Sequence, residues 1–165
     1  MKKNLLICFS FALLFFTACG RKDCCVTPKN DKPFLTAEKS GVQWEVSPAT
    51  ATYSQDTINV YGSNYKTNPE EVFGFLLKVN AEGTYNLDGK QAYYYNTVGQ
   101  DVSVSGYKLD DTFANTVKVT TYDKTAGIIA GTFQIKFIKT YDNPTGSYPD
   151  KIAFLNGKFK VALHK

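Results

Sequence analysis

Hydrophobic and polar residues alternate along most of the chain with the two-residue period of half-buried β-strands. The clearest alternations lie at 132–137 and 158–163, where aromatic and aliphatic residues share one face and polar residues the other. Shorter alternations of the same kind cover 42–46, 58–61, 102–104 and 117–119. No window of eleven positions repeats its apolar residues at the spacing of an amphipathic helix. The pattern therefore predicts an all-β protein.

Three further segments add detail to this prediction. Residues 72–79 are apolar on both parities, which is typical of a central strand covered on both faces. Residues 84–87 lead into Asp88-Gly89, a type I′ hairpin signal before a strand at 91–95. The Asn-Pro-Glu-Glu sequence at 68–71 has the cap and acids of a first helical turn. We predict a single antiparallel β-sandwich or barrel-like domain of about eight to ten strands.

The first residues of the chain follow a different pattern. Lys2 and Lys3 precede an almost unbroken apolar run at 5–16, which is too short to span the ~30 Å hydrocarbon core of a membrane. Thr17-Ala18-Cys19-Gly20 follows and resembles the lipobox of bacterial lipoproteins. The resemblance implies removal of residues 1–18, attachment of fatty acyl chains such as palmitate at Cys19, and a membrane as partner. An ordinary cleaved signal peptide and an uncleaved anchor are the alternatives.

The next segment, 19–39, is polar and mixed in charge, with Pro28 and Pro33 and no hydrophobic period. We predict that it is a flexible tether and that the β domain occupies 40–165. The lipobox resemblance implies a lipoprotein of the outer membrane, in the cell envelope, and leaves open whether the domain faces the periplasm or the cell surface.

Charge and cysteine content narrow the possible partners. Without Lys2 and Lys3, 17 basic residues face 15 acidic ones, and no basic run or basic-aromatic stripe is present. We therefore expect no nucleic-acid partner. Cys24 and Cys25 lie in the predicted tether, where a disulfide, a soft-metal site and two free thiols all remain open. The predicted β domain has no cysteine, so its stability must come from its hydrophobic core.

Residues suited to catalysis or metal binding are scarce. His164 is the only histidine and the penultimate residue, a poor position for a Ser-His-Asp triad or a zinc site. Glu70-Glu71 and Asp110-Asp111 are adjacent pairs, whose members point to opposite faces of a strand. The oxygen-rich segment 142–146 lacks the spacing of an EF-hand and is typical of a turn. We predict no catalytic residues, no metal site and no cofactor.

Aromatic residues are the remaining candidates for binding. Tyr93 and Tyr95 would lie on the same side of one strand, where they could stack against a sugar ring or a protein surface. Trp44 could join that surface, or lie in the core with its N–H paired. Asp56-Thr57-Ile58 resembles the acceptor for O-glycans in Bacteroidota, which implies a glycan on Thr57.

The order of strands and turns near the end of the chain also carries a resemblance. The segment 117–123, a turn and the segment 129–135 are followed by Gly157-Lys158-Phe159, and Gly41 to Trp44 opens the domain. Together they resemble the small Bacteroidota lipoproteins of domain-of-unknown-function family 6252, over Phe34 to Leu163. That family has no assigned activity, so the resemblance implies a fold and an envelope location only.

These observations lead to one functional hypothesis with two rivals. The first is a lipid-anchored, non-catalytic envelope domain that binds a glycan or an envelope protein. The second is a lipocalin-like carrier, which requires an interior cavity of a few hundred Å³ to hold an apolar molecule. The third is a hydrolase, which requires an acid pair assembled from separate strands. The sequence leaves the ligand and the oligomeric state open.

The anchoring hypothesis makes a direct prediction for Cys19→Ala. Loss of the thiol removes the acyl chains, each stabilising membrane association by ~0.8 kcal/mol per buried CH₂, so the variant should leave the membrane fraction. Cell fractionation and the intact mass of the mature protein measure this. A variant that stays in the membrane with an unchanged mature mass contradicts lipidation.

Overall fold

The computed structural model describes residues 32–143 and 146–164, which contain eleven β-strands and no helix. The strands are β1 (Phe34–Lys39), β2 (Val42–Val46), β3 (Thr50–Ser54), β4 (Thr57–Asn64), β5 (Glu70–Leu77), β6 (Gly83–Asn86), β7 (Ala92–Val98), β8 (Val102–Leu109), β9 (Thr116–Asp123), β10 (Ile128–Asp142) and β11 (Lys151–His164). The all-β prediction is confirmed.

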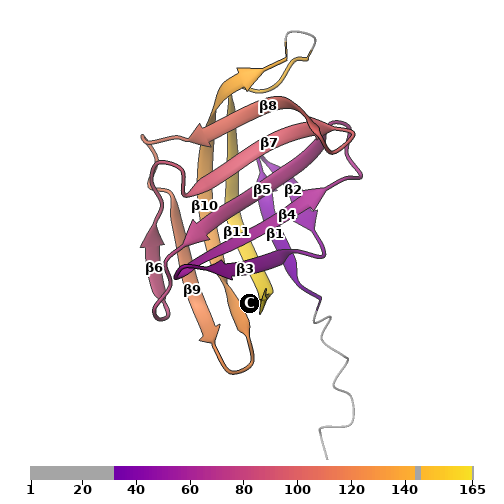
Figure 1. Ribbon diagram of the computed structural model, residues 1–165. Helices are drawn as coiled ribbons and strands as arrows, with labels where there is room; N and C mark the ends of the chain where they lie inside the picture. Colours follow the sequence, from indigo (N-terminus) through magenta and orange to yellow (C-terminus); the bar gives the residue numbers. More distant parts are fainter. Residues whose placement is uncertain (1–31, 144–145, 165) are drawn as a thin grey trace, which may run out of the picture. The chain divides into compact units, whose positions relative to one another are not determined.

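The strands form one hydrogen-bonded sheet that closes on itself. Its order is β2-β1-β11-β3-β4-β5-β7-β8-β10-β9-β6, and an additional pairing of β10 with β11 makes a ring of the seven strands from β11 to β10. The pairing of β11 with β3 is parallel, and the other pairings are antiparallel. In Figure 1, β3, β4, β5, β7 and β8 cross in front of the long β10–β11 hairpin. The fold thus combines a closed ring with two crossed layers.

The β10–β11 hairpin contributes to both layers because each strand divides one of its edges between two partners. Along β10, residues 128–134 pair with β9 and residues 137–142 pair with β8. Along β11, residues 154–160 pair with β1, and Leu163 and His164 pair with β3. The back layer is therefore β6-β9-β10-β11-β1-β2, and the front layer is β3-β4-β5-β7-β8. The front layer joins the back layer at two places: β8 pairs with the end of β10, and β3 pairs with the end of β11.

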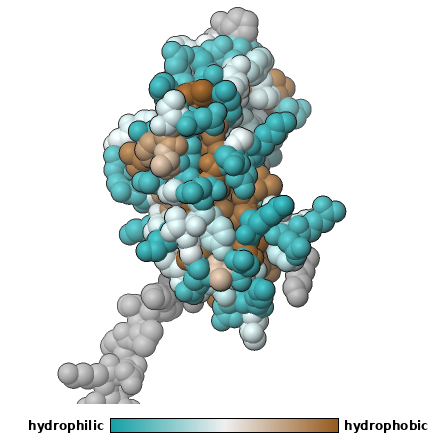
Figure 2. Space-filling model, turned by 90° about the vertical axis from the view of Figure 1, so that its left-hand side faces the viewer, coloured by the Kyte–Doolittle hydropathy of each residue, from teal (hydrophilic) through white to brown (hydrophobic). Residues whose placement is uncertain are grey.

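Aromatic side chains fill the space between the layers. Phe73 of β5 lies at the centre, with its ring centroid 4.6 Å from that of Phe154 and 5.3 Å from that of Phe133. Edge-on contacts add Trp44 and Phe137 to the same group. Such ring pairs contribute about 0.5–1.5 kcal/mol each beyond their buried area. On the side of the domain shown in Figure 2, mostly hydrophilic residues surround smaller hydrophobic patches.

Two strands were not expected from the sequence, and so the predicted count of eight to ten is too low. Residues 34–39, expected to belong to the tether, form β1, which lies between β11 and β2. Within β1, Leu35 and Ala37 are buried while their neighbours are not, but the alternation is too short to stand out in the sequence. The other unexpected strand is β3, whose Thr-Ala-Thr sequence carries little apolar area.

Of two local turn signals, the one at 88–89 was misinterpreted. The sequence 68–71 has the residues of a first helical turn, but it leads into a strand, as the all-β prediction requires, because β5 starts at Glu70. Asp88-Gly89 does not close a hairpin, since β6 pairs with β9 and β7 pairs with β5. Gly89 has a φ of 53° and still reverses the chain, with Gln91 N–H donating to the Asp88 carbonyl at 2.9 Å. A turn residue fixes the local backbone but not the strand that pairs next.

Gly131 marks a place where the back layer tolerates no side chain. The register of β10 against β9 shifts between Ala130 and Gly131, and a Cβ on Gly131 would collide with the carbonyl oxygen of Lys118. We expect Gly131→Ala to lower the free energy of unfolding by about 2–3 kcal/mol, because backbone must move to relieve the contact. Urea denaturation measures the change.

The matched control is Gly106→Ala in β8, where the nearest heavy atom to an added Cβ is Thr140 Oγ1 at 3.8 Å. This variant should unfold at nearly the wild-type urea concentration. Equal loss of stability in both variants would show that the collision at Lys118 is not the cause.

Candidate functional site

Tyrosines gather on the outer surface of the front layer. Along β7, Tyr94 points into the core, and Tyr93 and Tyr95 point outward, as the alternation predicted. Tyr93 lies opposite Gly74 of β5, which lies opposite Tyr61 of β4. These outward positions form a row across three strands.

A second row continues this surface toward β10. Tyr95 lies opposite Gly106 of β8, and Gly106 lies opposite Tyr141 of β10, whose side chain is 51% exposed. We call Tyr61, Tyr93, Tyr95 and Tyr141 the tyrosine face. Both rows alternate tyrosine with glycine across the strands, so the large rings have room to lie along the sheet.

Of the two predicted tyrosines, Tyr93 is held against the sheet and Tyr95 stacks on Tyr93. The Tyr93 ring extends over Gly74, where it occupies the space that a Cβ would need, and its hydroxyl donates to Asn59 Oδ1 at 3.1 Å. Its ring centroid lies 6.2 Å from that of Tyr95, with 27° between the ring planes. Burial raises the pKa of Tyr93 and of Tyr95 above its usual value, so both hydroxyls are neutral at physiological pH. The arrangement offers ordered, uncharged aromatic rings to a ligand.

Trp44 does not belong to this surface. It is only 5% exposed and packs edge-on against Phe154, with 5.0 Å between ring centroids. Its indole N–H donates to Glu71 Oε2 at 2.6 Å. Of the two interpretations of Trp44, the core position with a paired N–H is confirmed, and a role in a surface binding site is wrong.

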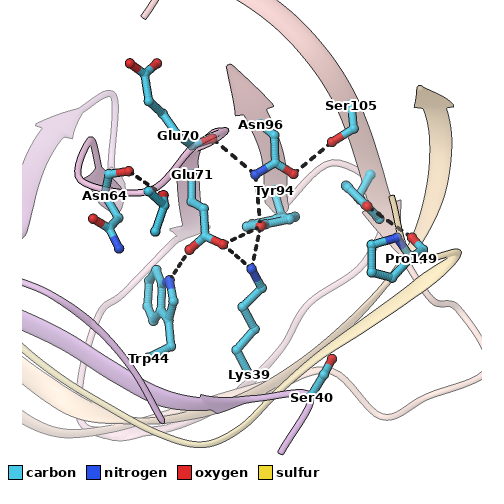
Figure 3. Close-up of polar contacts among 12 residues, drawn as sticks. Lys39, Ser40, Trp44, Asn64, Glu70, Glu71, Tyr94, Asn96, Ser105 and Pro149 are labelled. Atoms are coloured by element: carbon cyan, nitrogen blue, oxygen red, sulfur yellow. Dashed lines mark hydrogen bonds and ion pairs between the residues drawn. The ribbon is translucent and has the colours of Figure 1, made fainter. Parts of the chain in front are cut away.

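Trp44 leads instead to a polar cluster inside the domain, shown in Figure 3. Glu71 is 8% exposed, and its carboxylate accepts hydrogen bonds from Trp44, from the Lys39 ammonium group and from the Tyr94 hydroxyl, the last at 3.2 Å. Lys39 also donates to the Tyr94 hydroxyl at 2.8 Å. The buried charge is thus neutralised by one cation and held by two neutral donors.

The cluster extends from Tyr94 along β7 to Asn96 and from there to Ser105 of the neighbouring strand β8. Asn96 Nδ2 donates to the Tyr94 hydroxyl at 3.3 Å and to the Glu70 carbonyl at 3.1 Å, while Ser105 donates to Asn96 Oδ1 at 2.8 Å. Burial, together with the neighbouring Glu71 charge, raises the pKa of Tyr94 far above its usual value. In the part of the chain that the structure describes, no buried side-chain polar atom lacks a partner. The polar groups of the cluster are therefore all paired within the fold.

Sequence reasoning missed this cluster because it considered Glu71 only as one member of an adjacent acid pair, and not as a buried residue. In the structure the two carboxylates diverge. Glu70 Oε2 accepts from Thr97 Oγ1 and from the Gln100 backbone N–H, both at 2.8 Å, whereas Glu71 points inward. A buried position for residue 71 could have been found from its parity, which it shares with the inward-facing Phe73 and Phe75.

The other candidate acids are also engaged in local structure. Asp110 Oδ1 accepts from the Thr112 hydroxyl and backbone N–H, which holds the pKa of Asp110 below its usual value. Lys151 Nζ lies 3.7 Å from the same carboxylate. Among the described residues, no three His, Cys, Asp or Glu side chains gather as metal ligands. The His164 side chain lies outside the described part of the chain.

Thr57 opens β4 at a tight hairpin. It pairs with Ser54, and Gln55 and Asp56 between them have φ values of 47° and 61°. Its side chain is half-buried, and O-glycosylation of Thr57 stays a prediction. Cys19, Cys24 and Cys25 lie outside the described residues.

Protein-family models, curated proteins and solved structures were compared with the chain, and none of them matches it. The resemblance to family 6252 therefore stays a prediction. No helix capable of crossing a membrane occurs in the described portion of the chain.

The structural role of the buried cluster can be tested with Glu71→Gln. The amide replaces one acceptor oxygen with a donor, so at least one of the three donors loses its partner. We expect the free energy of unfolding to fall by about 2–3 kcal/mol, measured by urea denaturation.

Glu70→Gln is the matched control, because one amide oxygen can still accept from Thr97 and from the Gln100 N–H. This substitution should lower the free energy of unfolding by less than about 1 kcal/mol. If Glu71→Gln is as stable as the wild type, the cluster does not stabilise the fold.

Proposed function

We propose that this protein is a non-catalytic glycan-binding domain, held at the outer membrane of the cell envelope by lipid on Cys19. The observation that carries the proposal is the tyrosine face, and above all the ordered pair of Tyr93 and Tyr95 rings. Because Tyr93 is held by its hydrogen bond to Asn59 and Tyr95 stacks against it, little side-chain freedom is lost when a ligand stacks on the pair.

The chemistry of the surface suits a saccharide. The apolar face of a sugar ring packs against an aromatic ring, while its hydroxyl groups need donors and acceptors nearby. Asn59 and Ser63 lie on the same outward side of β4 as Tyr61. The neutral tyrosine hydroxyls both donate and accept. Stacking and hydrogen bonding are thus available within one patch.

The positions of the acids support a role without catalysis. A glycosidase requires two carboxyl groups about 5–10 Å apart that flank the bond to be broken. Glu70 and Glu71 lie on opposite sides of the sheet, and Glu71 is held by Lys39, Trp44 and Tyr94. Asp110 is held in a local turn by Thr112.

The core packing favours surface binding over the carrier hypothesis. A lipocalin-like carrier holds its ligand between the layers, where this domain has Phe73, Phe75, Phe133 and Phe154 in ring contact. A ligand of ordinary size would have to displace several of these rings, at a cost of about 3–5 kcal/mol for each one lost from the core.

The tyrosine face yields a binding prediction for the full-length protein in detergent, screened on an array of glycans. Tyr95→Ala and Tyr141→Ala should each weaken binding of a retained glycan about tenfold, through lost stacking. Isothermal titration calorimetry gives the affinities, and thermal unfolding checks that each variant is folded.

The control is Tyr53→Ala in β3, a tyrosine that is 39% exposed and lies outside the tyrosine face. It should bind like the wild type. The glycan proposal is wrong if no glycan on the array binds. If, in addition, the protein captures an envelope protein and Tyr95→Ala abolishes that capture, the partner of the tyrosine face is a protein.

A further inference from the structure

Lysine residues that are scattered in the sequence come together on the outer surface of the back layer. Strands β6, β9, β10 and β11 together contain six lysines and only two acidic residues, Asp123 and Asp142, each at the end of its strand. Three of those lysines, Lys118, Lys158 and Lys160, lie on β9 and β11, on either side of β10. A net charge near zero for the whole domain conceals this local excess of positive charge.

The register places these side chains in one row. Thr84 of β6 lies opposite Lys118 of β9, which lies opposite Thr132 of β10, which lies opposite Lys158 of β11. Because directly opposite residues share a face, the row alternates threonine and lysine across four strands. The two lysine Cα atoms are about 9.5 Å apart, the width of two strand spacings.

The sheet is hollowed along this row. A concavity of about 450 Å³ is lined by Thr84, Lys118, Thr132 and Lys158, together with Thr116 and Gln134 of the next row. Register shifts border it, one between β9 and β10 at Ala130 and another in β11 at Asn156, where φ is 53°. Bulges of this kind bend a strand and increase its twist, which accounts for the curvature.

The charged groups in the hollow are available to a ligand. Lys118 and Lys158 are exposed, and neither is in an ion pair with another residue that the structure describes. Two acids border the hollow on this side: Glu38 of β1 accepts a hydrogen bond from Asn156 Nδ2 at 3.3 Å, and Glu45 of β2 lies in the same row as Lys158, with Thr36 of β1 between them. The positive area is thus bounded on the β1 side and open over β9 to β11.

We propose that this hollow binds an acidic saccharide, independently of the tyrosine face. Lysine ammonium groups pair with carboxylate or other anionic groups on the sugars, and threonine, asparagine and glutamine side chains exchange hydrogen bonds with hydroxyl groups. The one aromatic residue lining it, Phe133, is 3% exposed and forms the floor. The hollow therefore lacks the stacking rings that single-stranded nucleic acids use and the apolar anchors typical of protein partners.

The test uses polygalacturonate, a polymer of acidic sugars, with its fully methyl-esterified form as the uncharged control ligand. The full-length protein in detergent should bind the acid form and not the ester, with an affinity that falls as salt is raised. Lys118→Gln combined with Lys158→Gln should weaken binding at least about tenfold, since two charge-assisted contacts are lost. Microscale thermophoresis measures the affinities.

The matched control is Lys66→Gln combined with Lys108→Gln, which removes equal charge from exposed positions outside the hollow. It should bind like the wild type, and so should Tyr95→Ala. The proposal is overturned if polygalacturonate does not bind, if the control variant loses as much affinity, or if single-stranded DNA binds equally well. If Tyr95→Ala binds polygalacturonate normally, binding in the hollow does not depend on the tyrosine face, and the two proposals can succeed or fail separately.

Discussion

The pairing of β10 with β11 is the interaction on which the rest of the domain depends. These two long strands form ten residue pairs with each other, and every other strand is attached to them directly or through one or two intervening strands. Because each strand divides its outer edge between two partners, one hairpin supports two layers that cross. Without this division the front and back layers would be separate sheets with four open edges.

The interior follows from this arrangement and contains two different kinds of packing. Phenylalanine rings fill most of the space, where contact is dense and largely non-directional. Around Glu71 a network of hydrogen bonds takes over, and it connects β1, β2, β5 and β7. A buried charge that requires three donors from three other strands is compatible with few alternative strand arrangements. Such a network adds conformational specificity that apolar contacts alone do not provide.

The fold class could be predicted from the sequence because alternation records which face of a strand is buried. Phe133, Ile135 and Phe137 are buried as the pattern indicated. The pairing of strands distant in sequence could not be predicted in this way, since alternation carries no information about neighbours. That limit explains the misinterpreted hairpin at Asp88-Gly89.

The same limit applies to the surfaces. Tyr93 and Tyr95 belong to one strand, so the sequence alone showed that they share a face. Tyr61 and Tyr141 join them only through the register of β4, β5, β8 and β10. The row of Lys118 and Lys158 likewise exists only across strands, and along the chain its members are separated by forty residues. For Trp44 the residue type was misleading. An aromatic residue suggested a binding surface, but in the structure Trp44 is buried against Phe154.

The position of β11 in the sheet has a consequence for how the chain folds as it is synthesised. It follows all other strands in the sequence, yet it lies between β1, β3 and β10 in space. Until residues 151–164 have been synthesised, β1 and β3 lack a partner that closes the ring. Contacts between such distant segments also form slowly. The ring must therefore remain open until its final strand is present, so the closed domain can form only after nearly the whole chain has been made.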